Sequence, residues 1–119
     1  MADVVERSPR SRDATPGPAD PVLARLRTAL QVAYGDRLER AVLFGSRARG
    51  DHRPDSDYDV AVFIERSEPL ARELDRLAEI ATDILLDTGA VVSAKPFPAG
   101  TWRARTGFMG ELRREGRAL

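Results

Sequence analysis

Apolar residues recur at helical spacing from position 22 onward, between residues that start and stop helices. Asp20 suits the position that caps a helix, Pro21 suits its first turn, and Gly35 suits its end. The apolar positions between them recur every three or four residues, with two neighbours sharing one place in the pattern: Val22, Leu26, Ala29 or Leu30, and Ala33. This pattern predicts a first helix of about 14 residues.

Two short apolar runs follow, and neither is long enough for a helix. The first, residues 41–44, ends at Gly45, and the second occupies residues 58–64. Short runs that are apolar without alternation are typical of strands buried on both faces. We therefore expect two buried strands joined by a polar loop.

A second amphipathic pattern predicts a long helix that ends near Gly89. Ser67 is placed to cap this helix, and Pro69 lies in its first turn. Five apolar residues mark its inner face: Leu70, Leu74, Leu77, Ala81 and Ile84. The opposite face carries charged residues, which is typical of a surface in contact with water.

The last part of the chain predicts a third strand and a further, partly helical segment. Residues 90–94 have the apolar pattern of a strand, and Pro96 and Pro98 are expected to end it. In residues 101–119 the candidates for burial are Trp102, Phe108, Met109 and Leu112. The resulting order of helices and strands predicts a small α/β sandwich with at least three strands.

Composition divides the chain near position 20. Residues 1–20 contain three prolines among polar and charged residues, with only Val4 and Val5 to bury, so we expect a disordered N-terminal arm. Residues 21–119 are expected to form a single domain, because a chain of 119 residues has no room for a second core.

Charge and cysteine content limit the classes of protein that fit. Nineteen basic residues balance nineteen acidic ones, so no net field favours nucleic acid or an anionic membrane. Eighteen of the basic residues are arginines, and we attribute the five between positions 103 and 117 to this general preference rather than to a binding patch. The sequence has no cysteine, no signal peptide and no apolar run that could span a bilayer. These features predict a cytoplasmic protein.

The candidate chemistry lies at a Gly-Ser turn and a pair of aspartates. Gly45 and Ser46 follow the first strand, and ten residues separate them from Asp57 and Asp59 at the start of the second. Residues two apart on a strand share a face, so both carboxylates can bind one Mg²⁺ ion, which prefers oxygen ligands. The glycine admits a phosphate to the backbone, the serine adds a hydroxyl, and two arginines of the same turn match phosphate oxygens. The candidate nucleotide-binding residues are Gly45, Ser46, Arg47 and Arg49, and the candidate catalytic and metal-binding residues are Asp57 and Asp59.

Two other ligand-binding motifs do not fit these residues. The spacing from Gly45 to Gly50 is that of a P-loop, but Asp51 and His52 stand where lysine and serine or threonine are required. A calcium loop that starts at Asp55 lacks both its glycine and its closing glutamate. Both motifs are therefore excluded.

The combination of turn, spacing and aspartates resembles the signature of the polymerase-β-like nucleotidyltransferase superfamily, and more narrowly the minimal nucleotidyltransferases. The resemblance is strong over residues 42–64, looser over the following helix and strand, and extends to residues 114–116. It implies a nucleotidyltransferase fold in which a mixed β-sheet is flanked by helices. It also implies that Mg²⁺ bridges the two aspartates and a nucleoside triphosphate such as ATP.

The resemblance further implies an activity and a partner. Minimal nucleotidyltransferases are commonly antitoxins of a HEPN-domain ribonuclease toxin, and some transfer AMP from ATP to a tyrosine of that toxin. In this chain Asp57 and Asp59 would carry the metal that stabilises charge at the α-phosphate. Ser46 and the Gly45 backbone would hold the β- and γ-phosphates.

One position departs from the family pattern. A third carboxylate usually follows on the next strand in a Gly-x-x-Val-Asp context, and matching from Gly89 puts Ser93 at that position. A serine is poorly suited to activating an incoming hydroxyl or completing a two-metal site, and Asp83 and Asp87 belong to the predicted helix. Two hypotheses stay open: a Mg²⁺-dependent adenylyltransferase, and a catalytically degenerate antitoxin that neutralises its toxin by direct binding.

Overall fold

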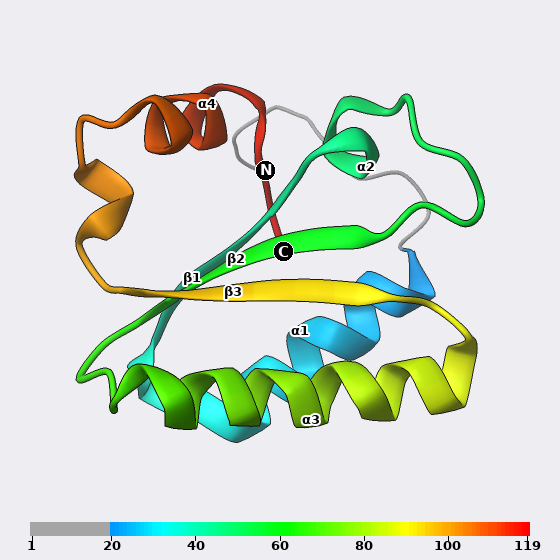
Figure 1. Ribbon diagram of the computed structural model, residues 1–119, viewed down its shortest axis with the longest axis horizontal. Helices are drawn as coiled ribbons and strands as arrows, with labels where there is room; N and C mark the ends of the chain where they lie inside the picture. Colours follow the sequence, from blue (N-terminus) through cyan, green and yellow to red (C-terminus); the bar gives the residue numbers. More distant parts are fainter. Residues whose placement is uncertain (1–19) are drawn as a thin grey trace, which may run out of the picture.

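Residues 20–119 form one mixed four-stranded sheet with helices on both faces in the computed structural model (Figure 1). The strands, in chain order, are β1 (Leu38–Phe44), β2 (Tyr58–Ile64), β3 (Val92–Pro98) and β4 (Arg117–Ala118). The order across the sheet is β3-β2-β1-β4, with β1 antiparallel to β2 and β4, and β2 parallel to β3. The predicted α/β fold with a mixed sheet and flanking helices is confirmed.

Alternation along β2 divides the core into two layers. The helices, in chain order, are α1 (Pro21–Tyr34), η2 (Gly35–Arg37), α2 (Ser46–Arg49), α3 (Leu70–Thr88), η3 (Thr101–Arg103) and α4 (Gly107–Glu115). Val60 and Val62 face α1 and α3, whereas Ala61 and Phe63 face η3 and α4. Each face of the sheet is therefore covered by its own helices, and a binding site on the sheet lies on one face or the other.

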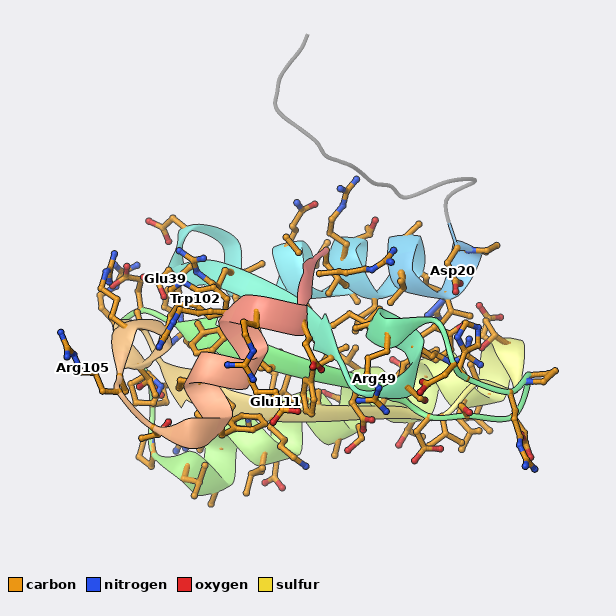
Figure 2. The ribbon with its side chains drawn as sticks, turned by 90° about the horizontal axis from the view of Figure 1, so that it is seen from above. Asp20, Glu39, Arg49, Trp102, Arg105 and Glu111 are labelled. Carbon is orange, nitrogen blue, oxygen red and sulfur yellow. The ribbon has the colours of Figure 1, made fainter. Side chains whose placement is uncertain are left out.

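Asp20 joins the first helix to the sheet, and it lies at the start of α1 (Figure 2). Its Oδ1 accepts a hydrogen bond from the Val22 N–H at 2.8 Å, which caps a helix of 14 residues. Its Oδ2 accepts a hydrogen bond from the Tyr58 hydroxyl, also at 2.8 Å. The rest of the predicted N-terminal arm, residues 1–19, lies outside the described residues.

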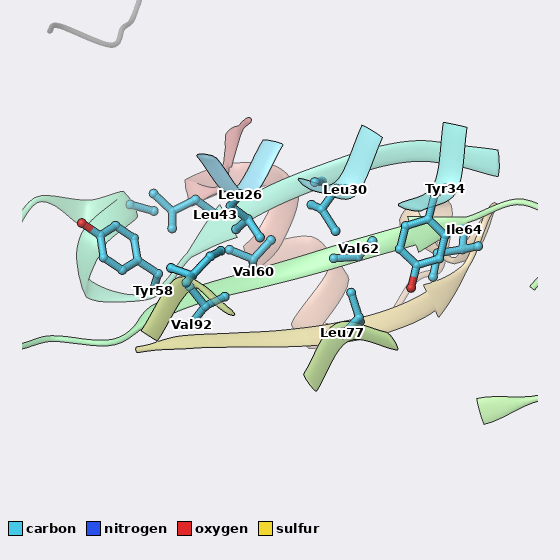
Figure 3. Packing of buried hydrophobic residues seen from close by; sticks show 13 residues of the cluster. Leu26, Leu30, Tyr34, Leu43, Tyr58, Val60, Val62, Ile64, Leu77 and Val92 are labelled. Atoms are coloured by element: carbon cyan, nitrogen blue, oxygen red, sulfur yellow. The ribbon is translucent and has the colours of Figure 1, made fainter. Parts of the chain in front are cut away.

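The layer under α1 and α3 is closely packed, as Figure 3 shows for Leu26, Val60 and Leu77. α3 nevertheless differs from its prediction at its start. The helix begins at Leu70 without a side-chain cap, so the predicted cap at Ser67 is wrong. On the predicted inner face, Leu77 and Ile84 are buried as predicted, with exposed fractions of 2% and 0%. Leu70 and Leu74 are exposed instead, at 63% and 46%.

β3 continues through two prolines that were expected to end it. Ala99 donates a hydrogen bond to the Ile64 carbonyl at 2.9 Å, so the backbone groups of the alternate residues Pro96 and Pro98 face away from β2. β3 is an edge strand, and at outward positions the missing N–H of proline removes no bond of the sheet. The predicted end at residue 94 is therefore wrong.

β4 is a strand of two residues that the sequence pattern did not predict. It pairs with Val42 and Leu43 of β1. Gly116 lies between α4 and β4, where a Cβ would overlap the Leu112 carbonyl oxygen and the Val42 side chain. Of the four residues of this region that were predicted to be buried, Met109 and Leu112 are buried. Trp102 is half-buried, and Phe108 is exposed.

Candidate functional site

The two candidate metal ligands lie at the start of β2. Asp57 directly precedes the strand and is exposed, and Asp59 is its second residue and is half-buried. Asp59 shares its face with Ala61 and Phe63, which is the face that α4 covers in part. Burial raises the pKa of Asp59, and the charge of Asp57 raises it further. Two carboxylates that repel each other at an accessible position fit a bound cation.

The Gly-Ser turn is in direct contact with Asp59, the second aspartate of this pair. Phe44, the last residue of β1, pairs with Asp59 across the sheet. Gly45 follows with φ +76°, and a Cβ at this position would lie 2.6 Å from Asp59 Oδ2. The close approach and the positive φ both require glycine. The structure thus brings the two halves of the sequence motif together.

Ser46 and Arg49 are the ends of α2, which is a single turn. The Ser46 carbonyl accepts hydrogen bonds from the N–H groups of Gly50 at 2.9 Å and Asp51 at 3.1 Å, which closes the turn. Arg49 is exposed and lies 3.4 Å from Asp51 Oδ2. Its guanidinium is held only by this surface pair within residues 20–119, so it can reorient toward a ligand.

Arg47 has partners other than the aspartates. Its Nε donates to the Ser56 carbonyl at 2.9 Å, and its Nη2 donates to the Pro54 carbonyl at 3.0 Å. Its guanidinium also lies 3.9 Å from the centre of the Tyr58 ring. Arg47 therefore holds the loop that carries Asp57 in place. Sequence reasoning missed this role because the partners of Arg47 lie six to eleven positions further along the chain. Its predicted contact with nucleotide stays a prediction.

Tyr58 is the platform on which Arg47 lies. Its side chain is buried on the face opposite to Asp59. Burial and the hydrogen bond to Asp20 raise the pKa of Tyr58 to about 12, so the hydroxyl stays a neutral donor. The end of the aspartate loop is thus fixed from the face of the sheet that α1 and α3 cover.

The position of the missing third carboxylate is next to Asp59. β3 pairs Ser93 with Asp59 in parallel register, as matching from Gly89 implied. Asp83 is exposed and Asp87 lies 2.9 Å from Arg25, both on the helix that covers the opposite face. Within residues 20–119, no group of three or more histidine, cysteine, aspartate or glutamate side chains is arranged to hold a metal. The metal-binding potential of this face therefore rests on the aspartate pair.

Lys95 is a cation on the same face that sequence reasoning missed. It pairs with Ala61 in the sheet, two residues beyond Ser93, and its charge opposes the rise in the pKa of Asp59. It is exposed, and it is the single lysine of the chain. Residues two apart on a strand share a face, so a predicted strand that continued past residue 94 would have placed Lys95 on the face of Ser93. Its ammonium group is a point charge suited to phosphate.

Residues 30–96 match the family model described as Polymerase beta, Nucleotidyltransferase. This segment is more than half of the 119 residues and contains the turn, both aspartates and Ser93. The chain belongs to the polymerase beta nucleotidyltransferase family. The predicted enzyme class is therefore confirmed: the protein is a nucleotidyltransferase, of a family that uses a nucleoside triphosphate and a divalent metal.

Two curated relatives of this nucleotidyltransferase come from Methanocaldococcus jannaschii. "Putative protein adenylyltransferase MJ0141" is 29% identical over 72 residues, which are 60% of this chain and 72% of the relative. "Putative protein adenylyltransferase MJ0604" is 33% identical over 66 residues, which are 56% of this chain and 60% of the relative.

Solved structures of similar fold include two toxin-antitoxins and a minimal nucleotidyltransferase. A toxin-antitoxin with AMP-PNP matches with a TM-score of 0.60 and 19% identity over 80% of this chain and 69% of the other. A double aspartate-to-glutamate mutant of the toxin-antitoxin MntA-HpeT matches with 0.58 and 17% over the same shares. The structure named a putative minimal nucleotidyltransferase matches with 0.56 and 24% over 87% of this chain and 100% of the other. At these identities the matches establish the fold. No helix within residues 20–119 is long and apolar enough to cross a membrane.

Proposed function

We propose that this nucleotidyltransferase transfers AMP from ATP to a tyrosine of a partner toxin of the HEPN class. Asp57 and Asp59 bind Mg²⁺, Gly45 and Ser46 hold the triphosphate, and Arg49 approaches it from the surface. The names of the two relatives support transfer of AMP to protein, and the toxin-antitoxin neighbours support a toxin as the partner. We also propose that the enzyme acts in the cytoplasm, where ATP is available.

The observation that carries the proposal is the contact between Gly45 and Asp59. Because a Cβ at position 45 would lie 2.6 Å from Asp59 Oδ2, a phosphate that reaches the Gly45 backbone also lies beside the carboxylate. Mg²⁺ is usually held by one or two carboxylates together with substrate phosphates, and the residues of this chain fit that arrangement. When bound, the ion supplies charge neutralisation at the α-phosphate.

The serine at position 93 favours an acidic hydroxyl as the acceptor. In the proposed reaction the acceptor oxygen forms a bond to the α-phosphorus of ATP, the bond from that phosphorus to the bridging oxygen of the β-phosphate breaks, and pyrophosphate leaves. The hydroxyl proton passes to water. A tyrosine hydroxyl, with a pKa of about 10, gives up this proton far more readily than a serine or threonine hydroxyl. Transfer to tyrosine therefore depends least on the carboxylate that Ser93 replaces.

The same serine supports a second candidate function. Ser93 stands beside Asp59, so residues 20–119 offer no third carboxylate at this position to complete a two-metal site. In this alternative the protein is a degenerate nucleotidyltransferase that neutralises the toxin by binding it, and the nucleotide site has no catalytic role.

Mass spectrometry separates the two functions. The protein is incubated with ATP, Mg²⁺ and the product of the adjacent gene, and the partner is weighed. We expect a mass increase of one AMP group or a multiple of it, abolished by EDTA, by Asp57→Asn and by Asp59→Asn. Asp55→Asn is the matched control, because it changes an exposed aspartate of the same loop. If the partner is inhibited equally by the wild type and both mutants without any mass change, the binding function is the correct one.

A further inference from the structure

A second group of cationic side chains lies away from the aspartates, around the single tryptophan of the chain. The group lines an open surface pocket of about 600 Å³ and consists of Arg40, Trp102, Arg103, Arg105 and Arg113. In Figure 2, Trp102 and Arg105 lie near one end of the molecule, and Arg49 lies toward the other. We call this surface pocket the arginine pocket. It is built from β1, η3 and the segments around α4, so it is separate from the Gly-Ser turn.

The pocket carries positive charge that the described residues do not balance. Within residues 20–119, its one ion pair joins Arg103 to Glu39, at 4.0 Å. Arg113 donates to the backbone carbonyls of Trp102 and Ala104, which are neutral acceptors and leave its charge in place. Arg105 is exposed and lies at the rim. Four guanidinium groups and one carboxylate therefore favour an anionic ligand.

Arg40 adds to the positive charge of the pocket. Its guanidinium lies 4.5 Å from the centre of the Trp102 ring. Its Nε is buried and has no acceptor among the described residues. Because no carboxylate of the described residues pairs with Arg40, its charge remains available to an anionic partner at the pocket.

The surroundings of Trp102 decide which anion fits. Arg40 lies over the ring, and the Phe63 ring meets it edge to face, with centres 5.6 Å apart. The guanidinium of Arg40 thus covers a face of the tryptophan that a nucleobase would need, and proteins that bind single-stranded nucleic acid rely on open aromatic faces. Guanidinium groups instead match carboxylates in paired hydrogen bonds.

We propose that the arginine pocket binds an acidic segment of the protein that accepts AMP. This inference rests on the proposed function in one respect, namely that the acceptor is a protein. Arg103, Arg105 and Arg113 form the exposed contacts, and Arg40 is half-buried beside Trp102. Docking at this pocket holds the acceptor while its hydroxyl reaches the aspartates at the other end of the molecule.

Trp102 makes occupancy of the pocket directly measurable, because it is the only tryptophan of the chain. The full-length protein is titrated with a peptide of eight glutamates at low salt, and the tryptophan emission is followed. We expect saturable quenching or a wavelength shift that disappears in the double variant Arg103→Glu/Arg105→Glu. Arg27→Glu is the matched control, because it reverses one exposed arginine on α1 and should leave the titration unchanged. No response to the peptide, or an equal response in the double variant, would overturn the proposal.

Two further measurements test the ligand class and separate this proposal from the proposed function. A single-stranded RNA of the same net charge is titrated in parallel, and tighter binding of the RNA than of the peptide would also overturn the proposal. For transfer to the adjacent-gene product, the double variant should raise KM for that protein at least tenfold and leave kcat within twofold. If the peptide binds through the two arginines while no AMP is transferred by the wild type, the proposed function fails and the acidic-ligand pocket stands.

Discussion

The backbone of Gly45 lies against the carboxylate of Asp59, so that a Cβ at position 45 would be 2.6 Å from Asp59 Oδ2. The two residues are fourteen positions apart in the sequence and are joined by the antiparallel pairing of Phe44 with Asp59. The glycine of the turn is therefore required by the position of the Asp59 carboxylate, independently of any ligand. A substitution at either position disturbs the other.

Gly45→Ala is expected to abolish transfer with a modest loss of stability. The methyl group displaces the Asp59 carboxylate, and the positive φ adds backbone strain of about 1 kcal/mol. Gly50→Ala is the matched control, since Gly50 has φ +88° and open space where a Cβ would lie. Transfer rates and thermal unfolding of both variants measure the difference. Equal losses of activity would mean that strain, not contact with Asp59, explains the effect.

Arg47→Ala is expected to loosen the loop that carries Asp57. The variant loses hydrogen bonds to two loop carbonyls and the contact with the Tyr58 ring, which together stabilise the fold by roughly 2 kcal/mol. Limited proteolysis should then cut within residues 50–57 faster than in the wild type. Arg49→Ala should cost less than about 0.5 kcal/mol, because its ion pair is exposed, and should raise KM for ATP instead. Identical effects of the two variants would contradict the separate roles.

Ser93→Asp is expected to restore a third carboxylate beside Asp59. The register of β2 and β3 brings the new side chain next to Asp59 on the accessible face. Metal affinity rises with the number of charged ligands, so the Mg²⁺ concentration for half-maximal transfer should fall by roughly tenfold. Ser93→Asn has a similar size without the charge and should leave it unchanged. If the Mg²⁺ concentration for half-maximal transfer falls in the asparagine variant as well, the shape of the side chain, not its charge, is responsible.

Lys95→Gln is expected to weaken nucleotide binding without unfolding the protein. The lysine is exposed on the face of Asp59, so its removal costs little packing while the face loses its positive charge. We expect KM for ATP to rise by roughly fivefold and the melting temperature to stay within experimental error. Lys95→Arg should retain most of the affinity. An unchanged KM in the glutamine variant would remove Lys95 from the site.

Glu73 is expected to make stability depend on pH. Burial opposes its charge, but the Glu68 N–H, Arg37 and Arg76 outweigh burial and lower the pKa of Glu73 below its ordinary value of 4.5. A carboxyl whose pKa falls on folding stabilises the fold above the unfolded pKa, and this contribution is lost as the pH drops through the folded pKa. The wild type should therefore lose stability below pH 4.5.

Glu73→Gln tests this dependence. The variant should lose roughly 2 kcal/mol at neutral pH, because the half-buried Arg37 and Arg76 lose the charge of their buried partner, and its stability should change less in acid. Urea denaturation over a range of pH measures both effects. Glu79→Gln changes an exposed carboxylate of the same helix and should follow the wild type. Parallel pH profiles for the wild type and Glu73→Gln would assign the acid sensitivity to other groups.

Local patterns predicted the elements whose signals lie within one segment. The first helix has both its cap and its stop in sequence, and the second strand is a continuous apolar run, so both were found with their boundaries. The aspartate pair and the turn were found because their spacing is a local signal. Long-range partners decided the rest. Glu73 is buried beside Arg37, which lies 36 positions earlier in the sequence, and two-residue β4 exists because β1 offers it a partner.

Arg47 and the arginine pocket show the same limit at the level of function. The sequence marks Arg47 as a cation beside a phosphate turn, but only the fold shows that loop carbonyls occupy its guanidinium. The late arginines look like a compositional preference until η3 and α4 bring Arg103, Arg105 and Arg113 near Arg40 of β1. Arg114 and Arg117 lie outside this pocket, so composition alone could not select its members.

The prolines of β3 restrict how another protein can approach. With Pro96 and Pro98 at the outward positions, the second half of this edge strand has no N–H to offer to a further strand. Addition of a strand from a second copy or from another protein is blocked along that half of the edge. Along that half of the edge, recognition of another protein must then rest on side chains, which makes specificity there a property of individual surface residues rather than of the backbone.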